Sequence, residues 1–382
     1  VQFCISHIIP HLSSQVKDTL SMLKLLDQMN SDFAPFPSTA ELVCCDVVSL
    51  YPSVDNQVGV PAVKDLLLKF PQPDGIPADL IMDALKLCLK HNPLKHEERF
   101  FQQKNGTAMG PAHACEYVDI AMEPLDQNLV TGCITKNINH GGYTRYRDDG
   151  FVILFDRDDL TDFQILLDDL HPKIKWEVRH NSTFIEHLDI GIHLSDGKIQ
   201  TDIFSKPSNS HIYLPRHSAH PPSVFTGIVK SVGYRLRTIC SNDVYLSKRV
   251  SEYLNYLTLS GYDKVETEKT LKEVAMLDRV KLLYRDPSQI PIKIKKKFPL
   301  VTKWDPRLPN VTTLMKKNLP ILYSNSENEK IFPKGSLICG FRRSKNIGEI
   351  ICPTIPIRIP KTQVFSEDGC FPEKCTNKRS CD

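Results

Sequence analysis

The spacing of hydrophobic positions divides the first 205 residues into alternating helices and strands. Apolar residues recur at helical intervals in five stretches, which predict amphipathic helices over 12–30 (with Ser13 and Ser14 as candidate caps), 60–70, 77–90, 111–129 and 160–170. Runs of β-branched and aromatic residues predict strands over 42–48, 100–101, 143–155 and 173–179, and a hairpin over 184–204 that turns at 195–197. Helices beside a sheet in this order indicate an α+β fold.

The second half of the chain has a different pattern. Residues 223–284 show helical periodicity, with basic side chains among the polar positions. Beyond Pro287 the chain is rich in Pro and Lys, which predicts a connector with a few short strands, SLICGF at 336–341 among them.

Three carboxylates interrupt two of the predicted strands. Asp46 lies inside the apolar run 42–48, and Asp148 and Asp149 divide the aromatic run 143–155. Acids in such runs are costly unless a cationic group compensates them. Two divalent metal ions about 3.5–4 Å apart would do so and would assist an in-line phosphoryl displacement. Polymerisation of nucleotides is therefore the leading interpretation, and salt-bridged or strand-end surface carboxylates are the plainer one.

The net charge of +3 conceals an asymmetry between the two halves. Residues 1–200 hold 17 Lys+Arg against 28 Asp+Glu, and residues 201–382 hold 31 against 17. An acidic first half suits cation sites, and a basic second half suits a polyanion, because Lys and Arg displace the counterions condensed on nucleic acid. Charge alone equally allows an ordinary solvated surface.

Composition also bears on where the protein acts. The twelve cysteines form no dense framework and no secretory segment opens the chain, so we expect reduced thiols in an intracellular protein. A nuclear location is expected as well, but it does not follow from composition. No apolar run approaches the roughly 20 residues that span a bilayer, so no membrane association is expected. At 382 residues, two or three subdomains are expected. The pattern begins abruptly at Val1 and stops just after a cysteine cluster, which predicts a fragment at both ends.

Several strings resemble, in order, the palm motifs of a reverse transcriptase, and most closely those of Penelope-like retroelements, which are relatives of telomerase. The three palm motifs are matched by DVVSLYPSV at 46–54, NGTAMGP at 105–111 and YRDD at 146–149. Two further strings resemble Penelope-like elements in particular: FSKPSNSHIYL at 204–214 and GFRRSKNIGEI at 340–350. The resemblance covers nearly the whole chain and implies an RNA-directed DNA polymerase, which extends a DNA primer on an RNA template from dNTPs.

The same resemblance implies a right-hand polymerase palm, an antiparallel sheet with flanking helices. Its implied division is partial fingers over 1–45, the palm over 46–210, a helical thumb over 211–290 and an irregular, basic, Pro-rich connector over 291–382. The basic fingers residues that grip the triphosphate are expected to precede Val1. The endonuclease that often follows in such elements has no counterpart here.

For the site, the resemblance makes Asp46 and Asp148 the ligands of both catalytic metals, with Asp149 beside them and the Val47 carbonyl as a further ligand. Mg²⁺, with Mn²⁺ as the alternative, suits such oxygen donors.

Other positions receive roles from the same motifs. Tyr51 would exclude a ribose 2′-hydroxyl, although an aromatic in a strand is more often part of a core. Gly106 and Gly110 would let the backbone approach nucleotide and template, or they form an ordinary helix-entry turn. Tyr146 would pack near the primer end, and Arg147 would be an outward-facing turn residue.

The remaining implied roles lie further along the palm. Lys173 or Lys175 would protonate the departing pyrophosphate, and the other would be a solubilising surface lysine. HLDIGI, with Leu188 and Asp189, resembles the primer-grip region. Lys206 belongs to a family string but has no derived role.

Five further residues are candidate metal ligands: His217, His220, Cys370, Cys375 and Cys381. The cysteines are spaced C-x4-C-x5-C, looser than the tight pairs of a structural zinc finger. A structural zinc site and free cysteines in a tail both remain open.

Two other functions compete with the polymerase. The first is a catalytically decayed or domesticated palm-and-thumb module that only binds nucleic acid, and the intact acids Asp46, Asp148 and Asp149 disfavour it. The second is a two-metal nuclease, which would need an additional acid-rich motif that the sequence lacks.

Overall fold

The structure is a computed structural model that describes residues 1–70, 72, 75–97, 99–284, 298–305, 311–322 and 337–342. The described residues fall into two compact units, the first ending at Phe204 and the second beginning at Ser205. Within this described part, no helix combines the length and apolar character needed to cross a bilayer.

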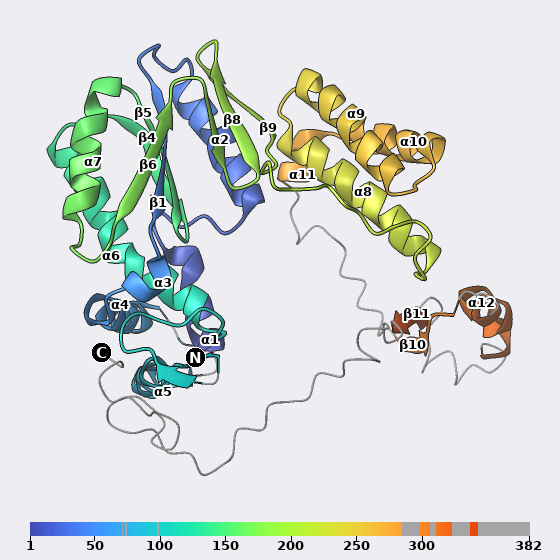
Figure 1. Ribbon diagram of the computed structural model, residues 1–382, viewed down its shortest axis with the longest axis horizontal. Helices are drawn as coiled ribbons and strands as arrows, with labels where there is room; N and C mark the ends of the chain where they lie inside the picture. The colour runs from blue at the N-terminus through green and yellow to red at the C-terminus, as the bar shows by residue number, and fades with distance from the viewer. Residues whose placement is uncertain are drawn as a thin grey trace. The chain divides into compact units, whose positions relative to one another are not determined.

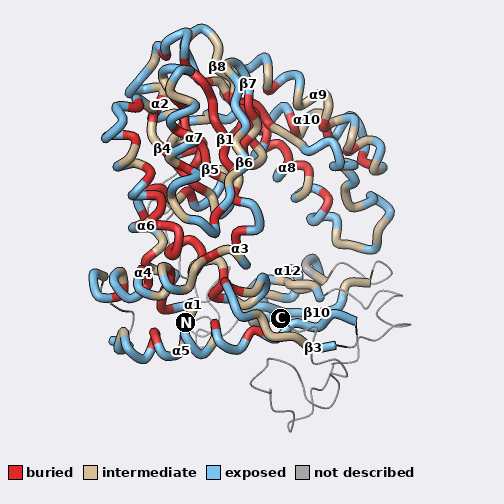
Figure 2. Tube along the Cα trace, turned by 60° about the vertical axis from the view of Figure 1, so that its left-hand side comes forward, coloured by how far each residue is buried: buried red, intermediate tan, exposed pale blue. Residues whose placement is uncertain are grey.

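A four-stranded antiparallel sheet organises the first unit. Its strands lie in the order β4 (His140–Tyr146), β5 (Asp149–Leu154), β1 (Glu41–Val47) and β6 (Trp176–Asn181). The central strands β1 and β5 are buried along most of their length (Figure 2). This burial explains why their sequences are almost continuously apolar, and it makes the acid in β1 conspicuous.

Each face of this sheet is covered by a different layer (Figure 1). On one face, Val43 and Cys45 pack with side chains of α6 (Ala114–Thr135) and α7 (Leu160–Asp169), the latter preceded by the 3₁₀ turn Arg157–Asp159. On the other face lie α2 (Thr19–Phe33) and a three-stranded sheet formed by β7 (Phe184–His187), β8 (Ile190–Ser195) and β9 (Lys198–Ile203). Cys44 meets His187 there, with Sγ 3.8 Å from Nδ1.

A second core lies where β1 ends and joins short helices. It gathers buried side chains of α1 (Gln2–Ser6), α3 (Leu50–Ser53), α4 (Asn56–Lys69), α5 (Ala78–Lys90) and the first half of α6. The 3₁₀ turn Ile9–His11 packs at its side, and a hairpin of β2 (Pro93–His96) and β3 (Arg99–Gln102) follows α5. Helix α6 therefore runs through both cores and ties them together.

The second unit begins with a helical bundle. Its helices are α8 (Pro222–Ile239), α9 (Asp243–Leu259), α10 (Lys264–Ala275) and α11 (Arg279–Leu283). Gly233 of α8 lets α10 approach closely, since an added Cβ would lie 3.0 Å from Val274 Cβ. Further on, β10 (Phe298–Lys303) pairs in parallel with β11 (Leu337–Arg342), and α12 (Val311–Leu322) lies between them in the sequence.

The α+β fold class predicted from the sequence is confirmed, but four local predictions are wrong. The single strand predicted over 143–155 is a hairpin of β4 and β5, because Arg147 adopts φ 55° in the turn between them. The first long helix begins at Thr19 rather than near residue 12, because Asp18 caps it by accepting from the Ser21 N–H at 2.8 Å. The hairpin predicted over 184–204 is three strands, because Leu188 adopts φ 57° in an extra tight turn. The Pro- and Lys-rich segment past residue 287 also contains a helix, α12.

Candidate active site

Carboxylates from three neighbouring strands line up at one end of the four-stranded sheet. Asp46 of β1 lies opposite Asp149 of β5 and opposite Glu177 of β6. Directly opposed residues of antiparallel strands point to the same face, so these acids form a carboxylate row. Asp148 adjoins the row from the β4–β5 turn, where its carbonyl accepts from the Val47 N–H at 2.9 Å. Asp148 is exposed and the row is at least partly exposed, so solvent ions reach it.

The carboxylate row concentrates negative charge. Burial raises the pKa of Asp46, and the charges of Asp148 and Glu177 raise it further, whereas a hydrogen bond with Asp149 lowers it. Like charges on adjacent strands repel each other, so a bound cation would relieve the row. The donors are hard oxygens, which fits Mg²⁺ or Mn²⁺. In the described chain no three His, Cys, Asp or Glu side chains are already gathered as a metal site, so phosphate and water oxygens would have to complete it.

The turn that carries Asp148 is anchored by a buried ion cluster of Arg145, Asp126 and Asp119. Arg145 is fully buried, and its guanidinium donates to the Asp126 carboxylate of α6 at 2.8–3.0 Å. The same guanidinium donates from Nη1 to the Arg147 carbonyl at 2.7 Å. Arg147 has φ 55°, a left-handed conformation that costs a non-glycine residue about 1–2 kcal/mol. The ion cluster therefore holds a strained turn in place from the buried side of the sheet.

Stability should depend on pH through Asp119. Burial raises the pKa of this carboxyl to about 6, and the Glu116 charge raises it too, although the guanidinium charges of Arg145, 3.6 Å away, and of Arg147 lower it. A raised folded-state pKa adds stability below the unfolded value near pH 4, and this stability is lost as pH rises through 6. Asp119→Asn cannot ionise, so its free energy of unfolding relative to that of wild type should rise by about 2 kcal/mol between pH 4 and pH 7.

Urea titrations of both proteins at several pH values between 4 and 7 would measure this difference. A wild-type-to-variant difference that does not change with pH would contradict the assignment of Asp119.

The Tyr51 hydroxyl contacts two polar side chains, one of them from the β4–β5 turn. Tyr51 lies on α3, which β1 enters directly through Ser49 at φ 51°. Its hydroxyl lies 3.4 Å from Cys115 Sγ of α6 and accepts from Arg147 Nη1 at 3.4 Å. Burial raises the pKa of Tyr51 to about 12, so the ring keeps its proton at neutral pH.

Arg147 corrects the prediction of an outward-facing turn residue. Its side chain is partly buried, reaches Tyr51, and also lies over the ring of Tyr146 with the guanidinium carbon 5.8 Å from the ring centroid. The left-handed backbone at Arg147 turns the side chain back toward α3 instead of into solvent.

The two glycines of the NGTAMGP loop differ in their surroundings. Gly106 has φ 66°, and an added Cβ would lie 2.2 Å from the Tyr51 carbonyl, so glycine is required for the loop to pack on α3. The neighbouring Thr107 N–H donates to that same carbonyl at 2.9 Å. Gly110 has φ 120° with open space around it, which leaves its backbone accessible.

The two lysines that could protonate the pyrophosphate have different surroundings. Lys173 forms an ion pair with Asp55 at 2.8 Å, and Asp55 caps α4. Lys175 is exposed, its carbonyl accepts from the Val48 N–H at 2.9 Å, and it precedes Glu177 by two residues, the spacing of side chains on one strand face.

The predicted primer-grip residues form the tight turn between β7 and β8. Leu188 is the left-handed residue of this turn, and Asp189 accepts from Thr19 Oγ1 of α2 at 2.6 Å.

The proposed zinc ligands are only partly described. His220 Nδ1 lies 2.9 Å from Ser218 Oγ, and neither His217 nor His220 joins a third metal-binding side chain within the described residues. Cys370, Cys375 and Cys381 lie outside those residues.

Sequence analysis missed Glu177 and the ion cluster. Asp119, Glu123 and Asp126 are spaced i, i+4 and i+7 in the predicted helix over 111–129, and this acidic stripe on an otherwise apolar helix was the available signal. In the structure all three are buried, and Glu123 accepts from Ser13 Oγ at 2.8 Å. This contact explains why Ser13 does not cap a helix.

Comparison with known proteins bears on the fold. A telomerase from Candida albicans, in complex with the TWJ fragment of telomeric RNA, aligns over 86% of this chain and 57% of its own, with 9% identity and a TM-score of 0.55. Apo telomerase from Candida tropicalis aligns over 72% and 51%, with 12% identity and a TM-score of 0.46. The RNA-dependent RNA polymerase of a human picobirnavirus aligns over 72% and 50%, with 12% identity and a TM-score of 0.43.

The antiparallel sheets and flanking helices thus define a polymerase palm-like fold, as in telomerase. The chain spans about half the length of the telomerases to which it is similar. A family model described as an animal helix-turn-helix domain matches residues 212–272, in the second unit. No protein with curated function matches the sequence.

Proposed function

We propose that this chain is the palm-containing part of an RNA-directed DNA polymerase of the Penelope-like kind, which extends a DNA primer on an RNA template from dNTPs. The observation that carries the proposal is the carboxylate row beside Asp148, at the open end of a palm-like sheet. The order of the DVVSLYPSV, NGTAMGP and YRDD motifs supports it. The fold shared with a telomerase supports it at the level of architecture.

In this proposal Asp46, Asp148 and the Val47 carbonyl would hold Mg²⁺ or Mn²⁺, with Asp149 beside them. When bound, these ions would acidify the primer 3′-hydroxyl and neutralise charge on the departing pyrophosphate. Lys175 would give the pyrophosphate its proton, because the Lys173 ammonium is already paired with Asp55.

The remaining roles concern how substrates are placed. The accessible backbone at Gly110 would lie against the nucleotide, and Tyr146 with the Leu188–Asp189 turn would support the primer. The division into fingers, palm, thumb and connector, and a nuclear location, belong to the same proposal.

Primer extension tests the proposal directly. The chain should incorporate dTTP on poly(rA)/oligo(dT) with Mg²⁺ or Mn²⁺, and chelation should stop incorporation. A chain that binds this primer-template yet incorporates nothing with either metal would contradict the catalytic proposal.

Sugar discrimination should depend on Tyr51 and on Arg147, which holds it. Tyr51→Ala removes the ring that would meet a 2′-hydroxyl. Arg147→Ala removes one of the two contacts that position the Tyr51 hydroxyl. Loss of a steric and hydrogen-bonded constraint of about 1–3 kcal/mol should lower the preference for dTTP over UTP about 5- to 150-fold in Tyr51→Ala. Arg147→Ala should have a smaller effect in the same direction.

The measurement is kcat/KM for dTTP and UTP on one primer-template. Tyr51→Phe keeps the ring but loses both hydroxyl contacts, so its discrimination should fall at least as much as that of Arg147→Ala and far less than that of Tyr51→Ala. Unchanged discrimination in Tyr51→Ala would show that another group senses the sugar.

A nucleic-acid-binding module without catalysis is the second candidate. The match of residues 212–272 to a helix-turn-helix model favours it, because such helices commonly dock on DNA. Under this alternative, binding to a primer-template would fall steeply with salt while no extension occurs.

A further inference from the structure

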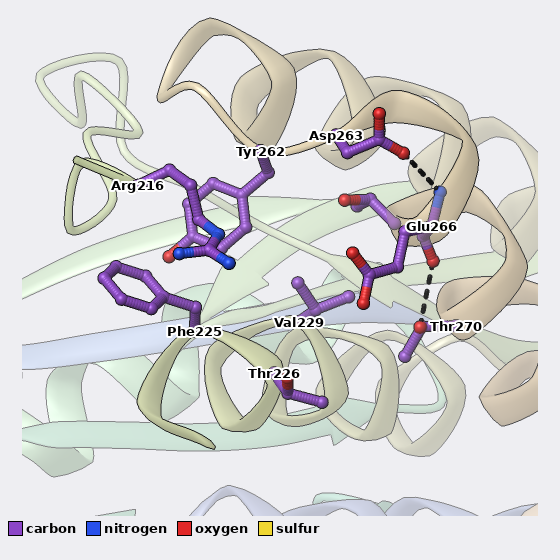
Figure 3. A pocket seen from close by; sticks show the side chains of 9 residues that line it. Arg216, Phe225, Thr226, Val229, Tyr262, Asp263, Glu266 and Thr270 are labelled. Atoms are coloured by element: carbon purple, nitrogen blue, oxygen red, sulfur yellow. Dashed lines mark hydrogen bonds between the residues drawn. The ribbon is translucent and has the colours of Figure 1, made fainter. Parts of the chain in front are cut away.

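Three hollows in the second unit differ in size and in the charge of their linings. The hollow in Figure 3 has a volume of about 30 Å³, room for about one water molecule. Arg216 lies over the Phe225 ring there at 4.5 Å, and Glu266 lines its other side. A second hollow, on α10, is lined by Glu268 and Glu273 together with Lys269 and Lys272, and no aromatic ring lines it. The first hollow is too small for a base, and the second offers no ring on which a base could stack.

The third hollow is the one that suits nucleic acid. It has a volume of about 480 Å³ and lies between the segment 210–217 and the C-terminal end of α9. Its lining contains four planar rings and no carboxylate: His211, Tyr213, His217 and Tyr256. We call it the ring-lined hollow. A volume of this size accommodates a small planar ligand such as a nucleobase.

The rings are held in place by a strained segment of backbone. His211 has φ 51°, a left-handed conformation, and its N–H donates to Asn209 Oδ1 at 3.0 Å. Its imidazole stacks on Tyr256 with ring centroids 4.1 Å apart and an interplanar angle of 7°. Strain of this kind persists only where the surroundings enforce it, and it is often found at ligand sites. The family string FSKPSNSHIYL, which has no role in the carboxylate site, thus builds this ring platform.

The rim and the surrounding charge indicate the same ligand. Ile212 and Leu259 line the hollow yet are 80% and 79% exposed, so a ligand would cover apolar surface that water now touches. Residues 205–284 hold 12 Lys+Arg against 7 Asp+Glu, which gives this part of the chain an excess of positive charge. Unpaired bases bind to proteins by stacking on aromatic rings beside such charge.

We propose that the ring-lined hollow binds one unpaired nucleobase of single-stranded RNA or DNA, stacked on the His211–Tyr256 platform. The site goes beyond nucleotide transfer, because a single strand can bind there whether or not the carboxylate row is active.

Fluorescence anisotropy with the full chain tests this proposal, using labelled oligo(dT), oligo(rU) and a DNA duplex of the same length. Alanine substitution at a stacking residue removes about 1–3 kcal/mol per base, so His211→Ala should weaken single-strand binding about 5- to 150-fold. Duplex binding should not change. His211→Phe restores a flat ring and should bind single strands nearly as wild type. A loss confined to one oligonucleotide would show that the site accepts that nucleotide, and oligo(dU) would then separate the effect of the sugar from that of the 5-methyl group.

Two further variants make the result decisive. Met276→Ala alters an 87%-exposed side chain in the α10 hollow and should leave all three affinities unchanged. Asp65→Ala, at an exposed carboxylate of α4, should also leave them unchanged. The His211→Ala loss should be the same when EDTA removes divalent metal, which separates this site from the polymerase proposal. Wild-type affinity of His211→Ala for both single strands, or an equal loss for duplex and single strands, would overturn the assignment. So would an equal loss in His211→Ala and His211→Phe.

Discussion

Replacing Asp148 by alanine should reduce primer extension by about a thousandfold or more. Metal ions held by carboxylates stabilise phosphoryl-transfer transition states by several kcal/mol, and about 4 kcal/mol corresponds to three decades in rate. Asp148 is exposed at the tip of a two-residue turn, so its removal should disturb the fold little. The loss should therefore appear in kcat, with the fold and primer-template affinity preserved.

The control for Asp148→Ala is Asp65→Ala, which removes an exposed carboxylate from α4 in the same unit. Activity of this control should match wild type within a factor of about two, as expected for a surface change of under 0.5 kcal/mol. Steady-state kinetics on poly(rA)/oligo(dT) and thermal melts of each protein make the comparison. Equal extension by wild type and Asp148→Ala would refute the proposed site.

Replacing Arg145 by methionine should destabilise the protein by about 3–5 kcal/mol. Removing one partner of a buried ion pair leaves the other charge uncompensated in a low-dielectric interior. Asp126 would be that charge, since it is 1% exposed and receives three hydrogen bonds from the guanidinium. Arg99→Met, at an exposed arginine of β3, is the matched control and should cost less than about 1 kcal/mol.

The double variant Arg145→Met/Asp126→Leu separates stability from positioning. An apolar pair in place of a buried ion pair is often as stable as the pair, so most of the lost stability should return. Primer extension should not return, because the Arg147 carbonyl still lacks its donor and the strained turn is no longer anchored. Urea unfolding and extension assays measure the two quantities. Full activity in the double variant would show that the ion cluster does not position the turn.

The motifs predicted that Asp46 and Asp149 converge because each lies in a recognisable strand, and Asp148 directly precedes the second of these strands. The antiparallel register that sets Asp46 opposite Asp149 follows from a hairpin and a central strand of nearly continuous apolar sequence. Glu177 could not be predicted, since its place beside Asp46 depends on the register between β1 and β6, strands 130 residues apart that no short turn connects. The catalytic roles of these acids stay predictions.

The sequence also did not predict which arginine side chains are buried. Arg145 sits in a strand beside Arg147, and sequence alone gives no reason to bury one and expose the other. The difference arises because α6 presents Asp119 and Asp126 to the Arg145 side of the sheet. Arg147 is turned back toward Tyr51 by a left-handed φ that local sequence does not require. Polar contacts between segments far apart in the sequence decided both positions, and periodicity does not report such contacts.

Localised backbone cleavage by Fe²⁺ is the most direct test that the carboxylate row and Asp148 surround a cation. Fe²⁺ replaces Mg²⁺ at oxygen sites, and with ascorbate and peroxide it generates radicals that cut the nearest peptide bonds. With primer-template and dTTP bound, cuts should cluster near residues 46, 148 and 177, and Asp46→Asn/Asp148→Asn should lose them. Cuts that avoid all three segments, or that persist unchanged in the double variant, would contradict a metal-dependent site at the end of this sheet.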